Sequence, residues 1–275
     1  MGILTIAGRA ALVTGILLLL GTAAIVGREG LSRARWHFHR RLRMVFPYLV
    51  MLAIVLGINE VARTVGPELS WVIGWNITSL IYAIEGDLVG RFQSIASAPL
   101  TSYFSFMYLY GYAFLLVFPF VAYFATDDQR PLKKTVIAFV CNYAIGVVAY
   151  VLFIAYGPRN FMPETVESLL YATYPQAQLL TREVNVNTNV FPSLHSSLSI
   201  TVAILAWQTR DIYPRWAVIA PWFALNIVIA TMYLGIHWAT DVVGGAVLAL
   251  GSVYLAGRWL SRLYGSELRR VVSIY

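Results

Sequence analysis

Charged residues and cysteine are both scarce in this sequence. Asp, Glu, Lys and Arg make up 12% of the 275 residues, roughly half the share of an ordinary soluble domain, and the mean hydropathy is +0.69. The single cysteine, Cys141, cannot form an internal disulfide and leaves no metal site built from cysteines. These shortages argue against a soluble enzyme, a disulfide-stabilised domain and a cysteine-ligated zinc protein.

Apolar residues take the place of the missing charges, in continuous runs of about twenty, the length that crosses a bilayer as a helix. Backbone groups in lipid find no water to bond, and the runs do not alternate as barrel strands do, so we predict helices. The predicted fold class is all-α, a polytopic membrane helix bundle with about seven transmembrane helices. The spans are expected at 3–26, 44–65, 99–124, 135–157, 191–208, 216–235 and 238–259.

The stretch 68–95 is less uniformly apolar than these runs. It carries two tryptophans and three charged residues: Trp71, Trp75, Glu85, Asp87 and Arg91. Tryptophan favours the membrane–water interface, and charges are costly at the bilayer centre. We therefore expect a helix lying at the interface here rather than another span.

Basic residues are unevenly distributed between the two sides of the predicted bundle. Of the 20 Lys and Arg residues, 15 fall on one side: Arg28, Arg33, Arg35, Arg40, Arg41, Arg43, Arg130, Lys133, Lys134, Arg210, Arg215, Arg258, Arg262, Arg269 and Arg270. Positive residues mark the cytoplasmic side, so we expect an integral protein of the cell membrane with its N-terminus outside and its C-terminus cytoplasmic. This distribution explains the net charge of +7 without a nucleic-acid partner.

One segment suited to phosphate binding runs from Phe191 to Ser197, at the start of a predicted span. Pro192 fits the first turn of a helix, and a helix start offers free N–H groups and a positive dipole end to a phosphate. The hydroxyl groups of Ser193 and Ser196 add hydrogen-bond donors. The segment also contains His195, which falls on the extracytoplasmic side of the predicted bundle.

A second segment, from Thr231 to Asp241, contains His237. His237 and Asp241 are four residues apart, so they share one face if the segment is helical. Asp241 can then accept a hydrogen bond from one ring nitrogen of His237 and leave the other as a nucleophile or base. A local hydrogen bond and a polar helix end are the structural alternatives for this pair, and serine-rich helix starts are commonly caps.

Two other functional classes use the same three side chains. A transporter would use His195, His237 and Asp241 in a proton or ion pathway, but such a pathway needs polar groups through the bilayer, and these gather at one face. A zinc hydrolase would use them as metal ligands, but it lacks a general-base carboxylate beside them. We expect no metal and no other cofactor.

The two segments resemble known motifs in order, spacing and side of the membrane. Pro192-Ser193-Leu194-His195 resembles the Pro-Ser-x-His motif of the type 2 phosphatidic acid phosphatase superfamily, and the segment ending in His237-Trp238-Ala239-Thr240-Asp241 resembles its third motif, Ser-Arg-x5-His-x3-Asp. The resemblance covers the five C-terminal spans. It implies a six-helix phosphatase-type core within a catalytic membrane domain, 44–275, preceded by an N-terminal transmembrane anchor and basic cytoplasmic loop, 1–43.

The resemblance also implies a role for each side chain. His237 would attack phosphorus and form a phosphohistidine, and Asp241 would orient it. His195 would protonate the leaving oxygen and later activate the acceptor, while Ser193 and nearby N–H groups would bind phosphate oxygens. Charge stabilisation of this kind needs no metal.

The sequence departs from the family pattern at two phosphate-binding positions. Thr231 stands where the third motif has Arg, and Leu152 stands where the first motif, Lys-x6-Arg-Pro, has Lys. Arg159 matches the Arg of that first motif and is expected to bind substrate, with Arg91 and Arg182 weighed as helpers or as ordinary interfacial arginines. We also place Thr231 and Ser196 in the substrate site.

These departures resemble the divergent branch that contains the inositol phosphorylceramide synthases, whose members transfer a phospho-headgroup between lipids. The resemblance implies a lipid phosphotransferase or lipid phosphatase, with a polyprenyl pyrophosphate or phosphatidate-type phosphatase as the alternative. The partners would be a lipid phosphate in the bilayer and, for transfer, a polyol or lipid alcohol. In the long loop 158–190, Asn189 is expected to hydrogen-bond a headgroup, with turn formation as the equal alternative.

Overall fold

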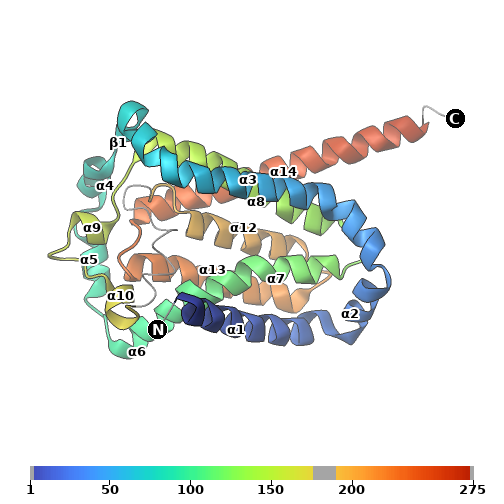
Figure 1. Cartoon of the computed structure of the whole chain (residues 1–275), viewed down its shortest axis with the longest axis horizontal. Coiled ribbons are helices and arrows are strands. Elements are labelled where there is room, and N and C mark those ends of the chain that lie inside the picture. Colours follow the sequence, from blue (N-terminus) through green and yellow to red (C-terminus); the bar gives the residue numbers. More distant parts are fainter. Residues whose placement is uncertain (1–2, 176–189, 273–275) are drawn as a thin grey trace.

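A computed structural model describes residues 3–175 and 190–272, with side chains for residues 7–175 and 190–264. Long helices running roughly along one direction form the bundle (Figure 1). These are α1 (Ile3–Gly21), α2 (Gly27–Trp36), α3 (Phe38–Ile73), α6 (Ala98–Phe106), α7 (Tyr112–Phe124), α8 (Arg130–Leu152), α12 (Leu194–Gln208), α13 (Pro214–Tyr233) and α14 (Ala239–Val272). Short π-helical segments join α1 to α2 and α6 to α7: η1 (Thr22–Val26) and η2 (Met107–Gly111).

Six helical segments in the described part are long and apolar enough to cross a membrane: Ala7–Trp36, Phe38–Ile73, Ala98–Phe124, Arg130–Leu152, Pro214–Tyr233 and Ala239–Tyr264. The all-α polytopic bundle is therefore confirmed. The predicted span 191–208 is the shorter helix α12, of 15 residues. At 1.5 Å per residue it is only about 22 Å long, and α8, α13 and α14 pack around it.

Two differences from the sequence analysis concern connections. The basic segment after the first span is helical rather than an open loop, because α2 and the start of α3 occupy it with a break at His37. The stretch 68–95 is not one interfacial helix. It contains the end of α3 and the short helices α4 (Thr78–Glu85) and α5 (Leu88–Gln93), because Gly86 takes a φ of 54° that ends α4.

Short elements gather at one end of the bundle, on the left of Figure 1. They are α4, α5, α9 (Pro158–Phe161), α10 (Leu169–Thr173) and a two-stranded parallel sheet of β1 (Trp75–Asn76) and β2 (Phe153–Ile154). The sheet joins the chain after α3 to the chain after α8. We call this the histidine end, since His195 lies there in the first turn of α12 and His237 lies there in the turn just before α14.

The opposite end, which we call the basic end, contains α2 and the first turns of α3, α8 and α13. Arg41 is buried there, and its guanidinium donates to Asp127 Oδ1 at 2.9 Å and to the Phe124 carbonyl at 2.7 Å. Arg215 donates to the Ala24 carbonyl at 2.7 Å. Basic side chains of this end therefore tie separate helices together. The largest core cluster runs between the two ends and includes Phe118 and Trp216.

Candidate active site

The turn that carries His237 is fixed by the way α13 ends. Gly235 adopts a φ of 70°, donates its N–H to the Met232 carbonyl at 2.9 Å, and lets Ile236 donate to the Thr231 carbonyl at 3.0 Å. This is a Schellman helix end, which favours glycine because other residues are strained at positive φ. The His237 N–H also reaches the Thr231 carbonyl, at 3.1 Å. The helix end therefore sets the direction in which His237 leaves α13.

Asp241 is held by the start of α14. It is the third residue of that helix, and its Oδ2 accepts the Trp238 backbone N–H at 2.9 Å, the reverse bond of a capping box. The same oxygen lies 3.3 Å from His237 Nδ1. The two side chains thus meet across a helix start, whereas the sequence analysis placed both on a helical face. Nδ1 faces the carboxylate, and this geometry directs Nε2 away from it.

His195 lies beside this pair, in the first turn of α12. The His195 and His237 ring centroids are 6.0 Å apart. Two tyrosine rings pack on His195, Tyr108 at 4.8 Å and Tyr112 at 4.6 Å between centroids. These rings come from η2 and the start of α7, which belong to one continuous span, so that span and α12 together position the imidazole.

A backbone hydrogen bond joins the two histidine segments directly. The Ser193 N–H donates to the Asp241 carbonyl at 3.0 Å. Ser193 Oγ accepts the Ser196 N–H at 3.3 Å, so Ser193 is the N-cap of α12, and its hydroxyl donates to Ser196 Oγ at 3.0 Å. Pro192 precedes this cap, rather than lying in the first helical turn as expected.

Arg159 supplies a buried positive charge. Its side chain, on α9, stacks on the Tyr171 ring with 4.7 Å from guanidinium carbon to ring centroid, and Nη2 donates to the Tyr171 hydroxyl at 3.3 Å. Arg159 is only 7% exposed, and within the described part of the chain its Nη1 has no hydrogen-bond partner. A buried cationic N–H without a partner is costly. The position is therefore suited to an anionic ligand.

The electrostatic environment of His237 favours its neutral form. Burial, followed by the positive charge of Arg159, lowers the pKa of His237 to about 3, against the effect of a hydrogen bond with the Val190 backbone. His237 is 4% exposed, in the turn between α13 and α14. Its imidazole is thus uncharged near neutral pH, and an unprotonated ring nitrogen is what nucleophilic attack requires.

A match to a known family covers this whole arrangement. The model of the PAP2 superfamily matches residues 79–255, which include both histidine segments and Arg159. The chain belongs to the PAP2 superfamily. Its function is thus of the phosphatase or phosphotransferase type, on lipid-like substrates. No curated protein and no solved structure matches the chain.

The departures from the PAP2 pattern are visible in the structure. Thr231 is fully buried, and its hydroxyl donates to the Val228 carbonyl of its own helix at 2.7 Å. Leu152 is 43% exposed at the end of α8. Neither position presents a cation to the site. Asn189 and Arg182, both weighed for substrate binding, lie outside the described residues, and Arg91 is exposed on α5.

The sequence analysis missed Glu85 as part of this site. Its carboxylate accepts the Ala239 N–H at 2.9 Å and the neighbouring Thr240 N–H, at the start of α14. Glu85 was noted only as a charge in an interfacial stretch, and no local pattern pairs it with residues about 155 positions later. It anchors α4 to the helix that carries Asp241.

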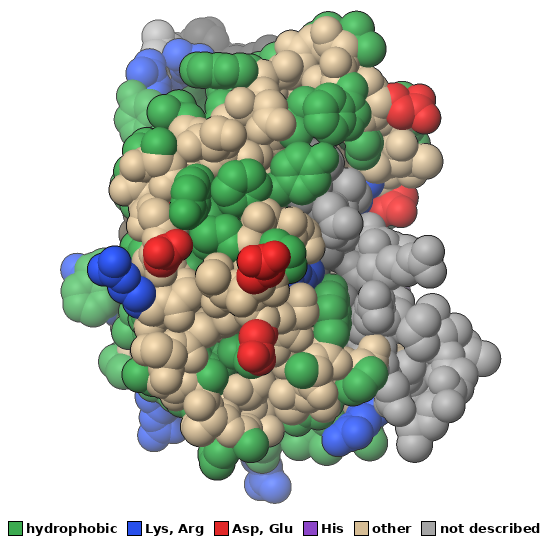
Figure 2. Space-filling model, turned by 90° about the vertical axis from the view of Figure 1, so that its left-hand side faces the viewer, with side chains coloured by type: hydrophobic (Ala, Val, Ile, Leu, Met, Phe, Trp, Pro, Cys, Tyr) green, Lys and Arg blue, Asp and Glu red, His purple; other side chains and the backbone are tan. Residues whose placement is uncertain are grey.

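The PAP2 site is buried at the histidine end. Figure 2 looks onto this end, where acidic side chains stand out among apolar ones. Exposed acids of this end include Asp87, Glu164 and Glu167. Within the described residues, no group of three or more His, Cys, Asp or Glu could hold a metal ion.

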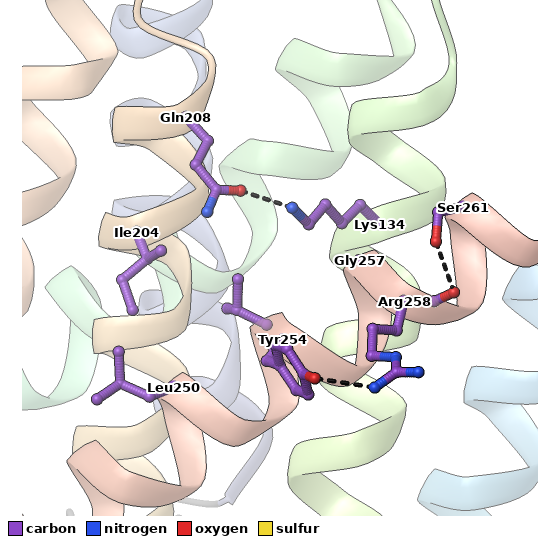
Figure 3. Close-up of a pocket in the computed structure, with 9 residues that line it drawn as sticks. Lys134, Ile204, Gln208, Leu250, Tyr254, Gly257, Arg258 and Ser261 are labelled. Atoms are coloured by element: carbon purple, nitrogen blue, oxygen red, sulfur yellow. Dashed lines mark hydrogen bonds between the residues drawn. The ribbon is translucent and has the colours of Figure 1, made fainter.

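A separate groove lies toward the basic end (Figure 3). Lys134 of α8 donates to Gln208 of α12 at 2.7 Å, and Arg258 of α14 donates to the Tyr254 hydroxyl at 3.0 Å. Figure 3 shows both cations already engaged with neighbouring side chains. None of the predicted catalytic residues lines this groove.

Proposed function

We propose that the protein is a lipid phosphotransferase that works through a phosphohistidine on His237 at the extracytoplasmic face of the membrane. The observation that carries the proposal is the convergence of His237, its partner Asp241, His195 and the buried cation Arg159 at one end of the bundle. These side chains come from the start of α12, from the turn and first residues that begin α14, and from α9, and in the proposed reaction they supply a nucleophile, an acid–base group and a charge.

In the first step, Nε2 of neutral His237 attacks phosphorus, and the bond from phosphorus to the leaving oxygen breaks. His195 gives its proton to that oxygen. The negative charge of a bound phosphate favours the protonated form of His195 that this step needs. Arg159 offers its unpartnered Nη1 to the phosphate oxygens, whose charge grows in the transition state.

In the second step, the roles of His195 reverse. Neutral His195 takes a proton from the acceptor hydroxyl, the acceptor oxygen attacks phosphorus, and the bond between His237 and phosphorus breaks. The two steps return both histidines to their starting states. Water as the acceptor gives a phosphatase, and a polyol or lipid alcohol gives a transferase, with the same residues in both cases.

Transfer is favoured over hydrolysis by the charge of the site. A phosphate monoester dianion benefits from several fixed cations, since charge-assisted hydrogen bonds are the strong ones. Thr231 and Leu152 supply none here. A phosphodiester or a headgroup-bearing lipid carries less charge on the reacting phosphorus, which suits a site with fewer cations. These departures also support placing the chain near the inositol phosphorylceramide synthase branch.

The test follows a labelled phosphate. Purified protein in lipid nanodiscs receives a phosphorus-labelled donor lipid with and without inositol, glycerol or diacylglycerol, and products are separated by thin-layer chromatography and mass spectrometry. Transfer of label to a new lipid or polyol supports the proposal. Quantitative release of inorganic phosphate from a phosphatidate or polyprenyl pyrophosphate, unaffected by any acceptor, would establish the phosphatase alternative instead.

The compartment of the site has its own test. The uneven distribution of basic residues supports an extracytoplasmic histidine end, with the N-terminus outside and the C-terminus inside. After replacement of Cys141 by serine, a cysteine introduced at Glu164 should react with an impermeant maleimide in intact cells. One introduced at Asp128 should react only after permeabilisation. The reverse pattern would contradict the proposed orientation.

A further inference from the structure

The two histidines of the site are supported in different ways. His237 has a carboxylate partner, since its Nδ1 lies 3.3 Å from Asp241 Oδ2. Among the residues that the structure describes, no acidic side chain pairs with His195 and no hydrogen bond engages its ring nitrogens. Its imidazole packs on two aromatic rings, Tyr108 at 4.8 Å and Tyr112 at 4.6 Å between centroids. His195 therefore has aromatic contacts where His237 has an ionic one.

Both tyrosines belong to an irregular turn in the span Ala98–Phe124. Its segment η2 is π-helical, and the Tyr112 N–H bonds to the Met107 carbonyl, five residues earlier. Tyr108 and Tyr112 are four residues apart, so their rings lie on the same side of the span. Single π-helical turns inside α-helices are frequent at functional sites. Here the irregular turn lies where the span passes His195.

Neither ring meets the imidazole edge-on. The ring planes of Tyr108 and His195 differ by 28°, a stacked arrangement, and those of Tyr112 and His195 differ by 41°. The face of an aromatic ring carries the negative part of its quadrupole, so it attracts a cation within about 6 Å of the ring centroid. A protonated imidazole is a cation, and a neutral imidazole gains less from the same contact. The two rings therefore favour the protonated form of His195.

Other groups act against a proton on His195. The ring centroid of His237 is 6.0 Å away, and a positive charge on that ring would repel one on His195. The charge of Arg63, on α3, acts in the same direction. Enclosure by helices also disfavours a charged imidazole, because it excludes water. A histidine that serves as an acid needs a contact that offsets these effects, and the tyrosine rings lie directly against it.

We propose that Tyr108 and Tyr112 are positioning residues that stabilise the imidazolium form of His195 and so prepare it to protonate the leaving oxygen. This inference rests on the proposed function. Before the first step, the two rings and the bound phosphate together keep the proton on His195. After the proton has moved to the leaving oxygen, neutral His195 stays packed on the same rings. It is then in position to accept the proton of the acceptor hydroxyl.

The first experiment measures the proton on His195 and needs no turnover. The chain has four histidines, so NMR of protein isotope-labelled only at histidine gives few signals, and His195→Ala identifies the one of interest. Tyr108→Leu and Tyr112→Leu should each lower the titration midpoint of His195 by about one pH unit, equivalent to 1.4 kcal/mol. Tyr112→Phe keeps the ring face and should match the wild type. Equal midpoints in the leucine variants and the wild type would overturn the proposal, as would a His195 that stays neutral wherever the protein is folded.

Loss of a large ring also disturbs packing, so a matched control is included. Phe114 lies on α7 in the same span, is 3% exposed, and packs on Phe118 and Trp216 rather than on a histidine. Phe114→Leu should lower the melting temperature at least as much as Tyr112→Leu and leave the titration of His195 unchanged. An equal shift of the midpoint in the control would assign the effect to packing and overturn the proposal.

The second experiment follows the same proton in catalysis. With a phospholipid donor, Tyr112→Leu should lower kcat about tenfold at neutral pH, because less of His195 is protonated. The alkaline limb of the pH–rate profile should move to lower pH, with little change in KM. With a p-nitrophenyl leaving group, which needs no proton, most of the loss should disappear. A tenfold loss with both substrates would contradict the proposed role of the ring.

The two experiments also separate this inference from the function on which it rests. Suppose that the titration of His195 depends on the rings, in a wild-type protein that turns over no lipid phosphate. That result would reject the proposed function and keep the rings as determinants of the charge on His195. Turnover of the donor lipid, with a titration of His195 that ignores the rings, would keep the function and reject the inference.

Discussion

The histidine end and the basic end both bury an arginine, but the two arginines have different partners. At the basic end, the Arg41 guanidinium meets the carboxylate of Asp127 at 2.9 Å. At the histidine end, Arg159 contacts the ring and hydroxyl of Tyr171, and no carboxylate among the described residues pairs with it. Buried atoms without partners in the described structure occur at both ends, Arg159 Nη1 at one and Arg41 Nε at the other, so the difference lies in charge. A cation paired with a carboxylate is neutralised and holds helices together, whereas the charge of Arg159 is left for an anion.

The strongest test of this contrast removes the nucleophile. His237→Ala should abolish turnover of the donor lipid, because the alanine methyl group cannot attack phosphorus and form the covalent intermediate. Asp241→Asn keeps the shape but disturbs the imidazole orientation, and we expect a loss on the order of 10⁴-fold. Rates are measured with labelled donor lipid, and size-exclusion profiles check that both variants stay folded. Near-normal rates would contradict the assignment of the site.

His195→Ala should slow turnover by about 10²–10⁴-fold, the usual contribution of one acid–base group. The loss should shrink for a substrate with a p-nitrophenyl leaving group, since that oxygen needs no proton. Comparing the two substrates separates a proton donor from a side chain that only packs against Tyr108 and Tyr112. An equal loss with both substrates would argue for packing.

The titration of His237 should couple stability to pH. Its folded pKa of about 3 lies below the unfolded value near 6.5, so below pH 6.5 the unfolded chain binds a proton that the folded chain does not. Stability should therefore fall as the pH drops from 6.5 toward 3, by about 2 kcal/mol at pH 5 from this group. Denaturant unfolding in detergent at pH 7 and pH 5 measures this loss. In His237→Ala, the free energy of unfolding should differ less between pH 7 and pH 5 than in the wild type. An unchanged difference would contradict the assignment of this pH dependence to His237.

Glu85→Ala tests the long-range anchor of the histidine end. Losing the acceptor for the Ala239 and Thr240 N–H groups should lower stability by about 1 kcal/mol, as for other helix caps. Activity should fall as well, because α14 also carries Asp241. Glu85→Gln keeps a carbonyl acceptor and should recover most of the stability. Apparent melting temperatures measure the stability of both variants, and rates with the donor lipid measure their activity. If Glu85→Ala matched the wild type in both, the contact between Glu85 and α14 would be dispensable.

Lys134→Ala should have the smallest effect. Its amino group is paired with Gln208 in a groove on the far side of the bundle from the triad, so the change should cost less than about 0.5 kcal/mol. Rates and lipid affinity should match those of the wild type. A large loss of activity would break the contrast between the two ends and give the groove of Figure 3 a functional role.

The sequence alone determined the helical membrane architecture and the local geometry around His237. Long apolar runs must form helices in lipid, and the four-residue spacing of His237 and Asp241 already limits how far apart they lie. Gly235 likewise acts locally, since its positive φ ends α13 and turns His237 toward the site. Such features depend on neighbours a few residues away, and a pattern in the chain is enough to predict them.

Only the tertiary structure decided which distant groups complete the site. Glu85 reaches the start of α14 across about 155 residues, and Tyr108 packs on His195 from a separate span. Local signals did not separate α4 from α5 or fix the start of α12 at Leu194. Contacts of this range depend on how whole helices pack, because side chains far apart in sequence meet only after their helices have been placed together.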